Sequence, residues 1–293
     1  MLTRNIHTEQ KVWTLEESFR HCERIAAEHY ENFPVASRFI PPHQRKHVAA
    51  IYSFARIADD FADEPGMTAA ERLELLSQWE KQLLECVGGS AHDPVFVALS
   101  ATIGEFQIPV DLFQSLLQAF RSDVVQNRYG TFADVLTYCS HSANPIGRLV
   151  LLLFNERSES LFSFSDRICT ALQLANFWQD ISIDLEKDRV YIPMEDLQRF
   201  GYSEAKLFQR TCTPEFRQLL GFEIDRTEQL FREGEPLLRD VGKELSFELR
   251  LTWNGGMRIL KKIRSQDYDV FRSRPTLSGF DKAALFLRSV LRS

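Results

Sequence analysis

Residues 49–63 read AAIYSFARIADDFAD. On a helix, the polar residues of this stretch recur every three or four positions and therefore share one face; they are Arg56, Asp59, Asp60 and Asp63. The rest of the stretch is apolar and helix-forming, and an isolated ionised carboxylate is costly to bury. The acidic face therefore needs a positive partner, and divalent metal with a polyphosphate is the leading candidate.

A second acidic stripe follows about 120 residues later, where residues 176–184 read NFWQDISID. Asn176, Asp180 and Asp184 are spaced at four and again share one helical face. Mg²⁺ prefers carboxylate oxygens and takes further ligands from substrate phosphates. If a helical bundle brings the two stripes face to face across a central cavity, they would hold several Mg²⁺ ions around one diphosphate.

The alternative is that each stripe is a solvated acidic helix face. The metal interpretation is favoured because both stripes follow apolar segments and carry a hydrogen-bonding residue, Arg56 or Asn176, one turn upstream. The residues expected to hold metal are Asp59, Asp63, Asn176, Asp180 and Asp184. Catalysis is assigned to Asp59, Asp60, Asp63, Asp180 and Asp184.

The bulk composition indicates a globular chain. Its 293 residues are 44% hydrophobic, and the formal net charge is −6 with a pI near 5.7. The Lys and Arg residues are scattered, which argues against a nucleic-acid partner. No Pro- or Ser-rich linker and no repeat is evident, so residues 1–293 are expected to form one domain, with 1–13 as an N-terminal extension.

Cysteine usage and the N-terminus indicate a cytoplasmic protein. The five cysteines show no metal-ligand spacing and cannot all pair within one chain, so we interpret them as reduced. The first residues have no apolar segment of a secretory signal. The longest apolar run, residues 149–154, is far too short to span a bilayer. Peripheral contact with the inner face of the membrane remains compatible with this.

The secondary-structure signals are helical throughout. Thr14 and Thr68 each stand three residues before a glutamate, as in capping boxes, and Asp93 and Thr213 each precede a proline. No sustained β-alternation is present. The fold class is therefore predicted as all-α, with helices near 15–30, 43–63, 69–87, 94–106, 110–127, 131–142, 146–156, 165–186, 203–209, 214–238, 243–265 and 278–291.

Several residues near the stripes are candidates for substrate contact. Arg189 is suited to binding phosphate, although an ion pair with Glu186 is the alternative. Tyr52, one turn before Arg56, would point into the same cavity or belong to the core. Phe33 is one of 23 phenylalanines, which would suit a cavity for a long hydrocarbon and for a cation in it.

Three segments together resemble the squalene/phytoene synthase family of head-to-head prenyl synthases. They are residues 49–63, residues 138–147, and residues 176–193 from Asn176 through Arg189 and Tyr191 to Pro193. The similarity extends over roughly residues 15–285. It implies a single-domain α-helical isoprenoid-synthase bundle around a central cavity, two or three Mg²⁺ ions, and the two Asp stripes as metal sites.

Within the family, residues 32–41 and 176–180 most resemble the bacterial hydroxysqualene synthase branch of the hopanoid pathway, HpnC. The resemblance implies presqualene diphosphate as substrate, hydroxysqualene as product and no requirement for NADPH. It also implies transfer of an apolar product to the membrane or to a following enzyme. The expected substrate-binding residues are Tyr52, Arg56, Asn176, Gln179, Arg189, Tyr191, Phe33, Asn144, Gly147 and Arg274.

Departures from the family pattern favour this branch. Squalene and phytoene synthases usually carry Arg where this chain has Gln179, and Ala-Gly where it has Ala143-Asn144. An enzyme that joins two farnesyl diphosphates holds two diphosphates, for which a cation at position 179 would be useful. A neutral amide at position 179 suits a substrate that carries only one diphosphate. Asn144 or Gln179 would then position the water, or each would only make a local hydrogen bond.

Two alternatives remain at this point. The nearest is head-to-head condensation of two farnesyl diphosphates to presqualene diphosphate, squalene or dehydrosqualene. The other is a non-catalytic helical assembly factor, which the two complete acidic stripes argue against.

Overall fold

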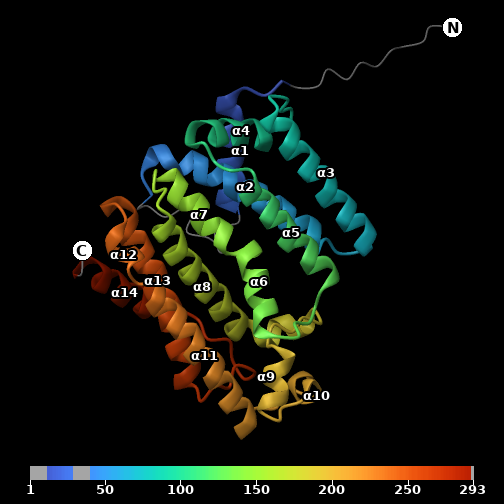
Figure 1. The fold of residues 1–293 in the computed structure, drawn as a ribbon, viewed down its shortest axis with the longest axis vertical. Helices are drawn as coiled ribbons and strands as arrows, with labels where there is room; N and C mark the ends of the chain where they lie inside the picture. The colour runs from blue at the N-terminus through green and yellow to red at the C-terminus, as the bar shows by residue number, and fades with distance from the viewer. Residues whose placement is uncertain (1–11, 29–39, 292–293) are drawn as a thin grey trace, which may run out of the picture.

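The computed structural model describes residues 12–28 and 40–291, and their regular structure is helical (Figure 1). The helices are α1 (Leu15–Glu28), α2 (Pro42–Asp63), α3 (Ala69–Val87), α4 (Pro94–Phe106), α5 (Asp111–Val125), α6 (Phe132–Ser142), α7 (Asn144–Leu153), α8 (Glu159–Glu186), α9 (Met194–Arg199), α10 (Glu204–Phe208), α11 (Pro214–Gly234), α12 (Leu237–Asp240), α13 (Lys243–Ser265) and α14 (Gly279–Leu291). The all-α prediction is confirmed.

The predicted capping signals start these helices. Thr68 and Glu71 form a reciprocal capping box at α3, and Thr14 and Glu17 do the same before α1. The Asp93 carboxylate accepts a hydrogen bond from the Val95 amide at 2.8 Å, one residue after Pro94. Such side chains satisfy backbone N–H groups that the helix itself leaves unpaired.

The helices differ from the prediction most clearly in three places. Helix α8 begins at Glu159 rather than near 165. Its N-cap residue, Ser158, makes no side-chain cap hydrogen bond. The predicted helix 214–238 is divided into α11 and α12 around Pro236, which cannot continue a helix hydrogen-bond ladder. The short helix α9 was not predicted, and it begins directly after Pro193.

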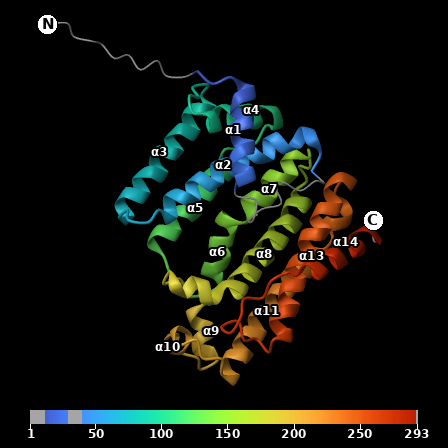
Figure 2. The ribbon, with the colours of Figure 1, turned by 180° about the vertical axis from the view of Figure 1, so that it is seen from behind.

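Two hydrophobic clusters build the interior. One unites α1–α5 with part of α7, and the other centres on α8, α11 and α13. Phe154 and Phe162 pack against both clusters. In both views α1–α5 lie at one end of the molecule and α8–α14 at the other, with α6 and α7 between them (Figures 1 and 2). The two helices that carry the acidic stripes, α2 and α8, thus contribute their apolar residues to different clusters.

No helix within the described residues is long and apolar enough to cross a membrane.

Candidate active site

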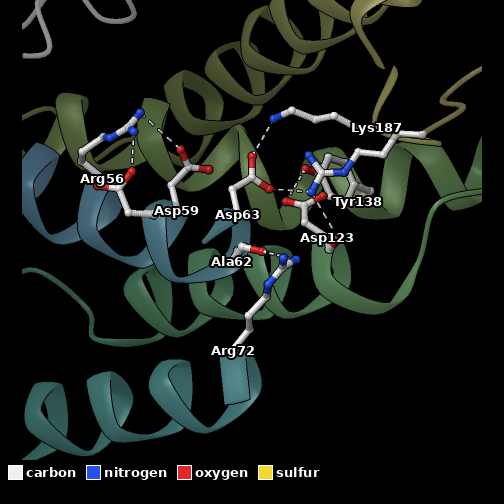
Figure 3. A network of polar contacts seen from close by, with 10 residues as sticks. Arg56, Asp59, Ala62, Asp63, Arg72, Asp123, Tyr138 and Lys187 are labelled. Carbon is white, nitrogen blue, oxygen red and sulfur yellow. Dashed lines mark hydrogen bonds and ion pairs between the residues drawn. The ribbon is translucent and has the colours of Figure 1, made fainter. Parts of the chain in front are cut away.

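The C-terminal end of α2 contacts the C-terminal end of α8 through Asp63. Its carboxylate accepts hydrogen bonds from Lys187 Nζ and Arg189 Nη2, each at 2.7 Å (Figure 3). Burial alone would raise the pKa of Asp63, but these two hydrogen bonds outweigh it and hold the pKa below its usual value. The alternative pairing of Arg189 with Glu186 is wrong, since Glu186 accepts from Arg210 at 3.0 Å.

Arg56 accompanies the other two carboxylates of the first stripe. It pairs with Asp60, and its Nη1 atom lies 3.5 Å from Asp59 Oδ2 (Figure 3). Burial and the nearby charge of Asp63 raise the pKa of Asp59. One guanidinium therefore serves two carboxylates, and Asp59 remains short of positive charge.

Asp123 and Tyr138 join this network, and the sequence prediction missed both. The Tyr138 hydroxyl donates to Asp123 Oδ2 at 3.0 Å, while Arg189 Nη2 donates to the Asp123 backbone carbonyl at 3.4 Å (Figure 3). Burial raises the pKa of Asp123 to about 6, and its Oδ1 atom has no hydrogen-bond partner within the described residues. An acidic residue directly before two valines at the end of α5 was the available signal.

The second stripe, on α8, contacts the segment that follows α13. Arg274 donates to Asp180 through Nε at 2.5 Å and through Nη2 at 3.0 Å. Burial and the charge of Asp180 raise the pKa of Asp184 to about 7. The Asn176 side chain is exposed on the same helical face. Of the two carboxylates of this stripe, Asp180 pairs with Arg274, and Asp184 makes no ion pair within the described residues.

The chemistry of these residues fits a divalent cation. Within residues 12–28 and 40–291, no group of three or more His, Cys, Asp or Glu side chains is arranged to hold a metal ion. Asp63 and Asp180 instead pair with basic side chains. The raised pKa values of Asp59 and Asp184 and the unpartnered Asp123 Oδ1 show carboxylates that lack positive charge. Carboxylate oxygens are the ligands that Mg²⁺ prefers.

A cavity of about 190 Å³ adjoins the first stripe. Asp59, Arg56 and Tyr52 supply polar groups to its wall, so the prediction that Tyr52 lines a cavity agrees with this geometry. The remaining wall is apolar and comes from α2, α5 and α7: Val48, Ile51, Ala55, Phe120, Ile146, Leu149, Val150 and Leu153. An acidic region thus leads directly into an apolar hollow, as an amphiphilic ligand requires.

Tyr191 packs against the aromatic side of α8. Its ring stacks on Phe177 with centroids 3.7 Å apart and planes 6° apart. Tyr191, Asp184 and Arg189 also border a second, smaller hollow. Phe33, predicted to contact the hydrocarbon, lies outside the described residues.

The two predicted substrate-binding positions on α7, Asn144 and Gly147, both contact α8. Asn144 Oδ1 accepts a hydrogen bond from the Thr170 hydroxyl at 2.9 Å. At Gly147, an added Cβ would lie 2.4 Å from Ser165 Oγ and 2.5 Å from Cys169 Sγ. The direct partners of both residues are therefore on α8, where close approach of the helices requires a glycine.

Gln179 also differs from the expectation of a residue directed at substrate or water. Its side chain is 8% exposed, and its Nε2 atom donates to the Pro275 carbonyl at 2.5 Å. Residues adjacent in a helix are about 100° apart, so Gln179 lies on a different face from Asp180. Its amide is engaged by the protein backbone.

The sequence is similar to a known family and to curated proteins over nearly its whole length. The family model described as squalene/phytoene synthase matches residues 26–281. Among curated relatives, a phytoene synthase of Arthrospira platensis is 28% identical over 296 aligned positions, which cover 96% of this chain and 94% of the relative. A 15-cis-phytoene synthase of Synechococcus elongatus is 27% identical with the same coverage.

Two solved structures superpose over most of the chain. Squalene synthase HpnC from Alicyclobacillus acidocaldarius is 39% identical, with a TM-score of 0.83 over 87% of this chain and 95% of that one. A dehydrosqualene synthase determined in complex with a ligand is 26% identical, with a TM-score of 0.85 over 95% and 97% of the two chains.

Proposed function

Because this chain belongs to the squalene/phytoene synthase family, we propose that it converts presqualene diphosphate and water into hydroxysqualene and diphosphate. The carbon–oxygen bond to the diphosphate breaks, the cyclopropylcarbinyl cation rearranges, and water captures it with loss of one proton. No hydride is needed, so no NADPH is required.

This proposal rests on the side chain of Gln179, which is neutral and hydrogen-bonded to the protein backbone. The family resemblance implies an arginine at this position, next to the second acidic stripe, in relatives that join two prenyl diphosphates. In this chain Gln179 adds no positive charge beside Asp180, and its amide is bound to the Pro275 carbonyl. Position 179 therefore supplies no cation for a second diphosphate. The 39% identity to an HpnC protein supports the same branch.

Mg²⁺ would be held by Asp59, Asp63, Asn176, Asp180 and Asp184, and it would polarise the departing diphosphate as a Lewis acid. The basic side chains would assist departure. Lys187, Arg189 and Arg274 contact carboxylates of the site, and their charges are suited to binding diphosphate oxygens once Mg²⁺ neutralises those carboxylates. They would thus help to hold the product anion.

The apolar cavity would protect the cation until water reaches it. Apart from Tyr52, Arg56 and Asp59, its wall is formed by aliphatic side chains and Phe120, which would exclude bulk water from the reacting carbons. Phe177 and Tyr191 would add aromatic faces near Asp184, and such faces stabilise cations.

The second candidate is head-to-head condensation of two allylic diphosphates. The similarity to phytoene synthases over 96% of the chain favours it. Purified protein incubated with Mg²⁺, without NADPH, and with either presqualene diphosphate or farnesyl diphosphate separates the two when products are identified by mass spectrometry. Hydroxysqualene from presqualene diphosphate supports the proposal, and consumption of farnesyl diphosphate alone would refute it.

A further inference from the structure

Gln179 has a structural partner that a substrate-binding role does not explain. Its side chain is buried, and the Pro275 residue whose carbonyl it binds at 2.5 Å is buried as well. A buried carbonyl that loses its donor is costly to leave unpaired. The bond therefore fixes Pro275 against α8.

Pro275 belongs to a segment, residues 266–278, that connects α13 to α14 and that we call the strap. Ser182, three residues after Gln179 on α8, donates to the Val270 carbonyl of the strap at 3.3 Å. Residues three apart share a helical face, so α8 binds the strap at two points about one turn apart. Within the strap, Gln266 Nε2 donates to the Asp269 and Ser273 carbonyls at 3.1 and 3.0 Å.

The strap delivers Arg274 to the acidic stripe. Arg274 directly precedes Pro275, and its side chain is 47% exposed where it pairs with Asp180. The ring of Pro275 restricts the backbone at this junction. Helix α8 thus contacts the strap through two adjacent residues. Gln179 binds the Pro275 carbonyl, and Asp180 pairs with the Arg274 guanidinium.

We propose that Gln179 is a positioning residue: by holding the Pro275 carbonyl, it sets where the Arg274 guanidinium stands relative to Asp180 and to the substrate diphosphate. It acts through Arg274 and touches neither substrate nor water. This inference rests on the proposed function for the identity of the diphosphate, but the geometry of the strap can be tested without turnover.

Hydrogen exchange of the ligand-free protein tests the anchoring. Gln179→Leu removes the donor at similar side-chain size, and amides of residues 267–278 should exchange about 10-fold faster, as expected when a buried carbonyl loses its partner. Gln44→Leu is the matched control, because the buried Gln44 amide donates to the Leu153 carbonyl at 2.7 Å, away from the strap. Strap exchange that is unchanged in Gln179→Leu, or equally faster in Gln44→Leu, would overturn the proposal.

A double-mutant cycle tests the action through Arg274. Calorimetric titration with inorganic diphosphate in the presence of Mg²⁺ should show about 10-fold weaker binding for Gln179→Leu. Arg274→Ala should weaken binding too, and the double variant should bind no more weakly than Arg274→Ala alone. Independent, multiplying losses would mean that Gln179 does not act through Arg274.

Two further variants keep the test decisive. Gln179→Arg retains N–H donors and should restore strap protection, whereas a purely volume-dependent role would not be rescued. If Gln179→Leu fails to fold, Gln179→Met, which has a similar length and no hydrogen-bond donor, replaces it. Failure of the wild-type protein to convert presqualene diphosphate would refute the proposed function, while the exchange and diphosphate measurements would still decide the role of Gln179.

Discussion

The Gly147→Ala substitution tests how closely α7 approaches α8 beside the cavity. The new Cβ would lie 2.4 Å from Ser165 Oγ and 2.5 Å from Cys169 Sγ, both on short side chains with little freedom to withdraw. Overpacking of this kind costs about 1–3 kcal/mol. Replacing a glycine within a helix by alanine by itself stabilises the helix by about 0.5–1 kcal/mol. The expected net loss of unfolding free energy is therefore about 1–2 kcal/mol.

Thermal unfolding is the assay. For a chain of this size, each kcal/mol changes Tm by about 2–4 °C, so Gly147→Ala should lower Tm by about 2–8 °C. Gly104→Ala is the matched control within α4, since its added Cβ meets no atom within 4 Å, and it should leave Tm unchanged or raise it. Adding Ser165→Ala to Gly147→Ala removes the nearer contact and should restore part of the loss.

The same variant reports on the cavity. Ile146, Leu149 and Val150 lie on α7 and line the cavity wall, so displacement of α7 should also lower turnover of the hydrocarbon substrate. If Gly147→Ala proved as stable as Gly104→Ala, the close packing of α7 on α8 would be refuted.

Asp63→Ala or Asp184→Ala should abolish turnover while helical circular dichroism stays near that of the wild type, and full activity in either variant would refute the proposed metal site. Chelation of Mg²⁺ should stop turnover, and added Mg²⁺ should restore it; activity that survives exhaustive chelation would contradict the Lewis-acid role. Burial raises the pKa of Glu223, beside Arg226 and Asp196, to about 8, so folding favours its protonated form. That stabilisation is complete below the carboxyl's usual pKa and is lost as pH rises through about 8. Glu223→Gln stays neutral, so urea unfolding should show its stability improving relative to wild type between about pH 5 and about pH 8; a constant difference would show that Glu223 does not titrate as expected.

Local chemistry explains why most of the helices could be predicted. Capping side chains such as Thr68 and Asp93 bond to amides two or three residues away, so the sequence contains both partners. The boundary errors arose where such a signal was weak: Ser158 makes no side-chain cap bond at the start of α8. The alignment of each acidic stripe on one face follows from helix periodicity and needed no tertiary information.

The partners of the acidic residues could not be predicted in the same way. Asp63 binds Lys187 and Arg189 in the segment that follows α8, and Asp123 accepts a hydrogen bond from Tyr138 across the α5–α6 packing. Which charges meet, and how far each is buried, depends on how distant helices pack, and burial then sets pKa values such as that of Asp123. No spacing in the sequence encodes these distances.

The sequence by itself determined an all-helical chain with two acidic stripes and a neutral residue at position 179. Only the tertiary structure decided what that residue does, because a glutamine's hydrogen-bond partner depends on which distant backbone packs against it. Here the partner is the Pro275 carbonyl rather than a ligand. The same packing brings Arg274 onto Asp180, 94 residues away in sequence, and places Gly147 in close contact with Ser165 and Cys169 of α8.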